Sequence, residues 1–144
     1  QDDFFYEDEA LEKIYIELES SNKFWLVNGS NHTQNDGHSF YWDLYPKWND
    51  GIIEGVNTIS SPSVLSAKRE LFDNIKFDTN LIMMMDCDFY YNAKQTYGDP
   101  IYYNDVLVTN RSHSTQVSSL YNDSENSNEK LKREVNYCKK KYFI

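Results

Sequence analysis

Two adjacent carboxylates, Asp2 and Asp3, stand just ahead of an acidic segment with helical spacing. Hard cations such as Mg²⁺ and Mn²⁺ that bind diphosphates take one or two protein carboxylates and leave positions open for phosphate oxygens. An acidic pair is also a common feature of solvated chain ends. Asp2 and Asp3 are therefore candidate metal or diphosphate contacts whose meaning depends on the rest of the sequence.

A second acidic pair, Asp86 and Asp88, follows the apolar run Leu81 to Met85. Successive residues of a helix differ in direction by about 100°, so the two side chains would point about 200° apart and could not serve one site. We expect Asp86 to face a cleft and Asp88 to make a structural hydrogen bond or ion pair. The apolar run would raise the pKa of Asp86 and suit it to act as a base. The alternative for Asp86 is a helix N-cap.

A third polar group, Arg111 with His113, follows a predicted strand. An arginine and a histidine at a strand end can hold an anionic diphosphate or a metal. The commoner explanation for such a pair is an ordinary surface position.

The spacing of apolar residues predicts the elements that position these groups. Helical periodicity and end signals predict three helices, at about Glu7 to Glu19, at Asp86 to Tyr97 with Gly98 as its stop, and at a last helix opened by Asn126 and Glu129. Extended patterns predict strands at Phe24 to Val27, Ser39 to Tyr45 and Ile101 to Thr109, and a strand running into a short helix at Val64 to Phe72. Loops are predicted at Pro46 to Ser63 and at Asn122 to Asn128. This alternation indicates an α/β fold with a mixed sheet.

Bulk properties limit the classes of protein. The 144 residues are 40% hydrophobic, which suits one domain spanning residues 1–144. A net charge of −9 argues against a nucleic-acid partner, and no apolar run is long enough for a membrane span. Cys87 and Cys138 lack metal-site spacing, which favours buried thiols in a reducing, cytoplasmic setting.

The order of the polar groups resembles the second half of family 2 glycosyltransferases with the GT-A fold. Those enzymes have paired aspartates at a strand end, a serine-containing loop before a basic-acidic turn, a Phe-Asp turn, an acidic motif opening a helix that ends in glycine, and an Arg-x-His close. The matching segments here are Asp2-Asp3, Ser60 to Glu70, Ile75 to Asp78, Asp86 to Gly98, and Arg111 to His113. The resemblance covers residues 1–119 and leaves out the polar loop and final helix of 120–144.

The resemblance implies an inverting transfer of sugar from a nucleotide-diphosphate sugar to a carbohydrate or lipid-linked acceptor. Asp86 would be the catalytic base, Asp3 and His113 would hold Mn²⁺ or Mg²⁺, and the substrate contacts would be Asp2, Ser63, Asp88 and Arg111. Position 85 is methionine where many relatives have glutamate.

The family's N-terminal nucleotide-binding strands are absent from this sequence, so the resemblance implies a partial GT-A fold. A chain of this extent is expected to be inactive by itself and to form a homodimer through unpaired sheet edges. The alternative is a non-catalytic carbohydrate-binding or interaction domain. Such a binding domain would be favoured if Trp25, Trp42 and Trp48 lined one exposed surface.

Overall fold

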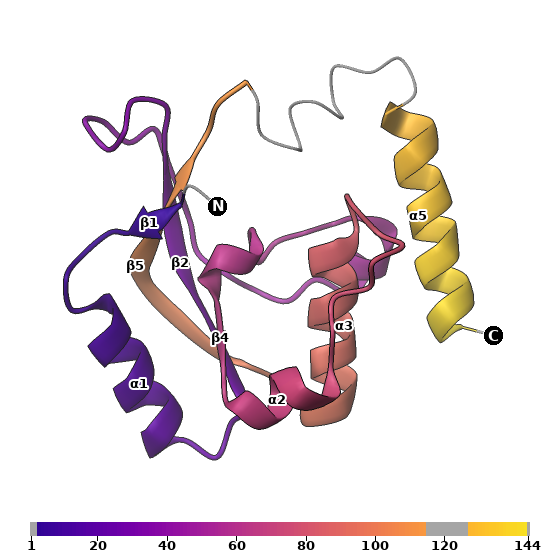
Figure 1. Ribbon diagram of the computed structural model, residues 1–144, viewed down its shortest axis with the longest axis horizontal. Helices are drawn as coiled ribbons and strands as arrows, with labels where there is room; N and C mark the ends of the chain where they lie inside the picture. The colour runs from indigo at the N-terminus through magenta and orange to yellow at the C-terminus, as the bar shows by residue number, and fades with distance from the viewer. Residues whose placement is uncertain (1–2, 115–126, 144) are drawn as a thin grey trace.

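A computed structural model describes residues 3–114 and 127–143 (Figure 1). The elements in chain order are β1 (Phe4–Phe5), α1 (Ala10–Ser20), β2 (Trp25–Thr33), β3 (Trp42–Leu44), the 3₁₀ turns η1 (Asp50–Glu54) and η2 (Pro62–Val64), β4 (Leu65–Ala67), α2 (Arg69–Asn74), α3 (Met85–Tyr97), β5 (Ile101–Arg111) and α5 (Ser127–Tyr142). Helices flank both faces of a mixed sheet, which confirms the α/β class. Asp2, the loop residues 122–126 and the Asn126 cap lie outside the described residues.

The centre of the sheet is β2. It runs parallel to β5 along one edge, and along its other edge it pairs antiparallel with β4 and then with β3. At the far side of β5, β1 pairs antiparallel, with Phe4 opposite Thr109. This last pairing places the residue before β1, Asp3, beside the end of β5.

Strand β2 is longer than the sequence predicts. The polar stretch Asn28 to Asn31, which reads as a turn after Phe24 to Val27, continues the strand and is buried. Gly29 makes this possible, because an added Cβ would lie 2.9 Å from the Asp105 carbonyl oxygen where the β2–β5 register shifts. The polar residues are therefore carried into the middle of the fold instead of ending the strand.

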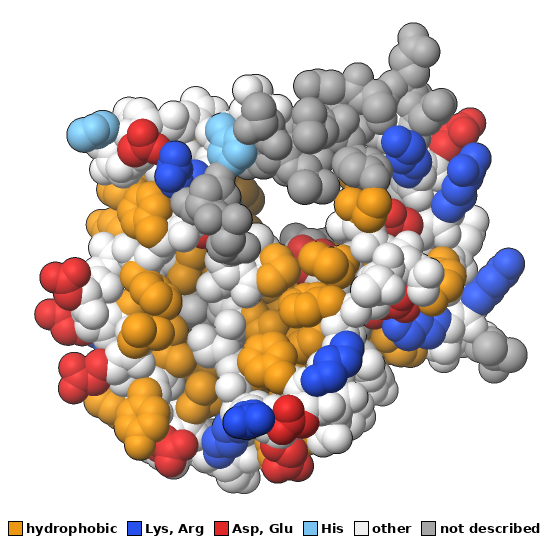
Figure 2. Space-filling view, in the orientation of Figure 1, with side chains coloured by type: hydrophobic (Ala, Val, Ile, Leu, Met, Phe, Trp, Pro, Cys, Tyr) orange, Lys and Arg blue, Asp and Glu red, His pale blue; other side chains and the backbone are white. Residues whose placement is uncertain are grey.

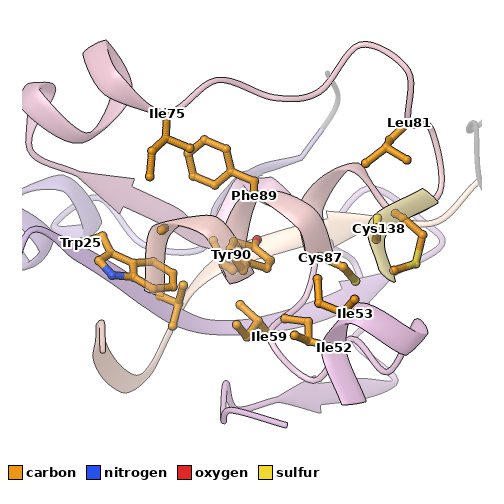
Figure 3. Packing of buried hydrophobic residues seen from close by; sticks show 14 of the residues in the cluster. Trp25, Ile52, Ile53, Ile59, Ile75, Leu81, Cys87, Phe89, Tyr90 and Cys138 are labelled. Carbon is orange, nitrogen blue, oxygen red and sulfur yellow. The ribbon is translucent and has the colours of Figure 1, made fainter. Parts of the chain in front are cut away.

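Two apolar layers cover the sheet. On one face, α1 packs through Ala10, Ile14 and Leu18 against Leu26 and Leu107 of the two central strands. The larger core lies on the other face, where α3 packs over β2 and η1 (Figure 3). Its residues that are less than 2% exposed include Trp25, Ile52, Ile53, Ile59, Phe89 and Tyr90.

Aromatic contacts fix the position of α3 in this core. Tyr90 stacks on Trp25 with ring centroids 6.2 Å apart, and Phe89 stacks on Phe77 at 4.3 Å. Burying side chains of this size contributes about 1.5–3 kcal/mol each. Because α3 begins at Met85, this packing also sets the direction of the acidic residues in its first turn.

The last helix, α5, is held by polar groups as well as by apolar packing. Lys141 donates to both carboxylate oxygens of Asp88, at 3.0 and 2.9 Å, and Tyr142 donates its hydroxyl to the same carboxylate at 2.9 Å. Glu134 accepts three backbone N–H groups from residues 82–84, at 2.8–3.1 Å. The helix therefore satisfies a buried acid of α3 and the free amides ahead of α3.

Both cysteines are unpaired and buried, as the sequence predicts. Burial raises the pKa of the Cys138 thiol to about 11 and that of Cys87 further above its ordinary value. Neither thiol is therefore poised as a nucleophile. Within residues 3–114 and 127–143, no helix combines the length and the apolar character that a membrane crossing requires.

Gly98 ends α3 in a conformation that other residues adopt at a cost, with φ 78° and ψ −169°. Replacing Gly98 by alanine should lower the free energy of unfolding by about 1–3 kcal/mol, because this region of backbone space is almost reserved for glycine. The cause would be backbone strain alone, since a Cβ here meets nothing within 4 Å. Urea denaturation measures the change, with Gln95→Ala, an exposed position in the same helix, as the control. Equal stabilities of the two variants would contradict the account.

Asp78 should make the fold sensitive to acid. The backbone N–H of Asn80, together with the Lys141 ammonium and the Tyr137 hydroxyl, lowers its pKa from 3.8 to about 2. A carboxyl whose pKa is lowered on folding stabilises the fold above its unfolded pKa, and this contribution is lost as the pH falls through the folded pKa. Stability should therefore drop between about pH 4 and pH 2, and less steeply in Asp78→Asn. Denaturant titrations at stepped pH measure this, with exposed Asp73→Asn as the control; identical slopes for wild type and Asp78→Asn would contradict it.

Candidate functional site

A cavity of about 750 Å³ opens between the end of the sheet and the loop that precedes α3. The space-filling view is hollowed here, with hydrophobic side chains gathered along one side (Figure 2). Its lining has a polar part and an apolar part. The polar part contains Asp3, His32, Asn57, Ser60, Ser61, Ser63, Asp86, Asn110, Arg111 and Ser112, and the apolar part contains Trp42, Leu44, Pro62, Phe77, Ile82, Met83 and Met85.

Asp3 is fixed at the cavity edge by groups distant in sequence. One carboxylate oxygen accepts the backbone N–H of Arg111 at 3.0 Å, and the other accepts the Ser63 hydroxyl. The antiparallel pairing of β1 with β5 brings these residues together. The first and last of the polar groups singled out in the sequence therefore meet at one place.

Asp86 lies in the first turn of α3 and borders the same cavity. Its Oδ2 accepts from the Asn57 amide at 2.8 Å, and its Oδ1 accepts the Cys87 backbone N–H at 2.9 Å. Burial raises its pKa, and these hydrogen bonds oppose the rise. The N-cap position of α3 is Met84, so Asp86 is not the cap. Asp86 is a half-buried carboxylate with raised proton affinity at a cavity wall.

Asn57 ties Asp86 to a strained loop. Its Oδ1 accepts the N–H groups of Ile59 and Ser60, and its Nδ2 donates to the Ser60 carbonyl as well as to Asp86. Ser60 has φ 111°, a conformation that costs a non-glycine residue about 1–3 kcal/mol. Tyr90 holds the loop from below by donating its hydroxyl toward the carbonyls of Ser60 and Ser61. The loop and the acid therefore form one unit.

A chain of polar side chains continues from this loop across the sheet. Asn110 donates to the Ser60 hydroxyl at 3.0 Å and lies 3.4 Å from Nε2 of His32. His32 stacks on Trp42 at 4.6 Å, and the Trp42 carbonyl lies 3.2 Å from its other ring nitrogen. Sequence reasoning missed His32, Asn57 and Asn110. No sequence signal singled them out, because His32 follows a stretch that reads as a turn and its contact with Trp42 depends on the pairing of β2 with β3.

The sequence-derived site residues separate into two groups. Asp3, Ser63, Asp86 and Arg111 line the cavity together. His113 is exposed, two residues beyond Arg111, and does not line it. Asp88 points away, as the helix geometry predicts. It is 1% exposed and bound by α5, so its role is structural and not the substrate contact that the resemblance implied.

Arg111 contacts two aspartates, one through its backbone and one through its side chain. Its backbone N–H binds Asp3, and its guanidinium pairs with Asp36 at 2.8 Å while remaining 40% exposed. A guanidinium has five donors, so the pairing with Asp36 leaves others for an anion.

The described residues fit a divalent cation only if a bound diphosphate supplies the other oxygen ligands. Within the described part of the chain, each Asp3 oxygen accepts one hydrogen bond, which leaves lone pairs for a cation. Among the described residues, no cluster of three or more His, Cys, Asp or Glu side chains is placed to hold a metal by itself. At this cavity, a cation carried by a bound diphosphate would contact the protein through the Asp3 carboxylate.

The surface that would favour a three-tryptophan binding domain is not formed. Trp25 is fully buried and donates its indole N–H to the Gly98 carbonyl at 2.9 Å. Trp42 is 53% exposed, and Trp48 is half-buried beneath Lys94. Of these three side chains, Trp42 alone borders the cavity.

Comparison with known proteins does not identify a family, so the assignment of a function rests on the geometry of the site. No protein-family model matches the chain, and no curated protein sequence matches it.

Proposed function

We propose that this chain supplies the diphosphate-binding and acceptor-binding side of a GT-A-type inverting glycosyltransferase. The observation that carries the proposal is the meeting of Asp3, Arg111 and Asp86 at one cavity from three distant segments. An anion-binding end and a half-buried carboxylate base are the two parts that such a transfer needs on opposite sides of the reacting carbon.

Asp86 acts as the base in this proposal. Its carboxylate takes the proton of an acceptor hydroxyl as that oxygen forms a bond to the anomeric carbon. The bond from this carbon to the diphosphate oxygen breaks at the same time, and its electron pair leaves with the diphosphate. A base whose pKa is raised toward the working pH accepts a proton more readily than an exposed carboxylate does. Asn57 and the Cys87 N–H keep the carboxylate oriented.

Asp3, Ser63 and Arg111 serve the departing diphosphate. Arg111 offers guanidinium donors to the phosphate oxygens, and Ser63 and the Arg111 N–H hold Asp3 in place. Asp3 would contact Mg²⁺ or Mn²⁺ carried by the diphosphate, and such a cation, when bound, neutralises charge that builds on the leaving group.

The cavity also has an apolar wall, which is formed by Phe77, Ile82, Met83 and Met85. Apolar side chains near the base exclude water, which strengthens the electrostatic interactions inside and limits hydrolysis of the donor. Ile82 is 48% exposed, so this wall remains open to an acceptor.

A transfer assay tests the proposal. Because residues 1–144 are expected to be inactive by themselves, the assay uses the longest natural polypeptide that contains them, incubated with Mn²⁺, a panel of UDP-, GDP- and dTDP-hexoses, and simple hexosides as acceptors. We expect acceptor-dependent release of a nucleoside diphosphate, with a product whose anomeric configuration is opposite to that of the donor. A product with retained configuration, or no turnover of any donor by folded protein, would overturn the proposal.

A further inference from the structure

A second concavity of about 380 Å³ lies against the other side of strands β2 and β3. We call it the aromatic pocket; it is lined by Tyr6, Asn31, Phe40, Tyr41, Trp42, Asp43 and Val106. Asn31 and Asp43 are register partners, one position along from the paired His32 and Trp42. Neighbouring residues of a strand point to opposite faces, so Asn31 and Asp43 face away from the cavity that holds Asp86.

Asn31 carries the most informative polar atom of this pocket. Its side chain is 3% exposed, and its Oδ1 has no hydrogen-bond partner among residues 3–114 and 127–143. A buried acceptor without a partner destabilises a fold, since it has lost water and gained nothing. Asn31 belongs to the pocket lining, and a rotation of its amide would bring this oxygen to a hydroxyl donor bound there.

The walls of the aromatic pocket are exposed aromatic rings. Tyr6, Phe40 and Tyr41 are 41–56% exposed, and Tyr6 meets Phe40 edge to face at 5.3 Å, whereas the Trp42 ring stacks on His32 toward the cavity. Rings that remain this open in a concave site present flat apolar faces with polar edges. Such faces suit the C–H face of a pyranose ring, whose hydroxyls project from its rim.

The charge of the pocket lining limits the chemical class of ligand that can bind. Among the described residues, the lining contains the carboxylate of Asp43 and neither lysine nor arginine. The Asp43 carboxylate accepts hydrogen bonds from the hydroxyls of a neutral sugar and repels phosphate or sulfate groups, while the Asn31 amide carries both an acceptor and a donor for sugar hydroxyls. The volume lies at the lower end of small-ligand sites, which suits one sugar ring.

We propose that the aromatic pocket binds one neutral pyranose unit of a glycan, stacked on its aromatic walls and hydrogen-bonded to Asn31 and Asp43. Trp42 borders both the aromatic pocket and the cavity, so a glycan held here lies beside the cavity. Binding at this pocket requires no transfer chemistry, and its test is independent of the proposed transferase activity.

Amide NMR titration with maltotriose, cellotriose and triacetylchitotriose tests this binding, with glucose 6-phosphate as a charged comparison. At least one neutral probe should shift the resonances of residues 31 and 40–43 at millimolar concentration, more than glucose 6-phosphate does. Phe40→Ala and Asn31→Leu should each weaken binding by about tenfold, the second because a hydroxyl would lose its acceptor. Asn31→Leu should keep or raise the melting temperature, because it removes an unpartnered buried oxygen.

Asn28→Leu is the matched control. Asn28 is a buried asparagine of the same strand whose Oδ1 has no partner in the described part of the chain, but it lies outside the aromatic pocket and its amide donates to the Gly29 carbonyl. It should lose stability and keep sugar binding. Absence of shifts with all three neutral probes, or wild-type binding by Asn31→Leu, would overturn the proposal. A loss of melting temperature in Asn31→Leu equal to that in Asn28→Leu would also overturn it, since Asn31 would then be a structural residue.

Discussion

Replacing Lys141 by methionine should lower the free energy of unfolding by about 3–5 kcal/mol, because it leaves a buried carboxylate without its cation. Asp88 is 1% exposed, and Lys141 contacts both of its oxygens. Methionine keeps most of the apolar stem, so packing changes little. Denaturant unfolding followed by circular dichroism measures the loss, which would be a large part of the stability of a domain of this size.

Lys140→Met is the matched control for this prediction. Lys140 is exposed, and its replacement should change stability by less than about 0.5 kcal/mol. Adding Asp88→Asn to Lys141→Met should recover part of the loss, because the neutral amide needs no counter-charge. Equal effects of the two lysine substitutions, or additive effects of the Asp88 and Lys141 substitutions, would show that the ion pair does not hold α5.

In the polypeptide used for the transfer assay, Asp86→Asn should reduce sugar transfer by about 10²–10⁴-fold, because it removes the proposed base and keeps the shape of the side chain. The amide can no longer take the acceptor proton. The rate of the wild-type protein should rise with pH through the raised pKa of Asp86, since the deprotonated carboxylate is the active form. This rising limb should be absent from the residual activity of Asp86→Asn. Initial rates across a pH series measure both effects.

Asp88→Asn separates a catalytic role from a structural one. It should lower stability through the loss of its pair with Lys141, and the protein that remains folded should transfer sugar at close to the wild-type rate. If Asp88→Asn were inactive while folded and Asp86→Asn stayed active, the roles of the two acids would be reversed.

The sequence predicts those parts of the fold that depend on neighbouring residues. Helical periodicity placed α1 and α3 to within a few residues, and the angle between successive helical residues separated the directions of Asp86 and Asp88. The strand followed by a short helix at 64–72 appears as β4 and α2. In each case the prediction depends only on residues that are close together in the sequence.

The parts that could not be predicted depend on contacts between distant segments. Asn28 to Asn31 read as a turn because polar residues usually follow a strand, yet here the sheet buries them. Asn57, Asn110 and His32 each look ordinary in sequence, and only the pairing of β2 with β5 and the position of the strained loop bring them together. Lys141 and Asp88 are 53 positions apart in the sequence, so no local pattern predicts their ion pair.

The placement of a diphosphate against Asp3 can be measured directly. Paramagnetic Mn²⁺ added with UDP to isotope-labelled protein broadens the amide resonances that lie near the bound ion. Broadening should concentrate on residues 63, 86 and 110–112 around the cavity, and Asp3→Asn should abolish it. Exposed Asp8→Asn should leave the pattern unchanged, which separates this site from general attraction to a chain of net charge −9. Broadening elsewhere on the surface, or the same pattern in Asp3→Asn, would contradict the assignment of this cavity to a nucleotide-diphosphate sugar.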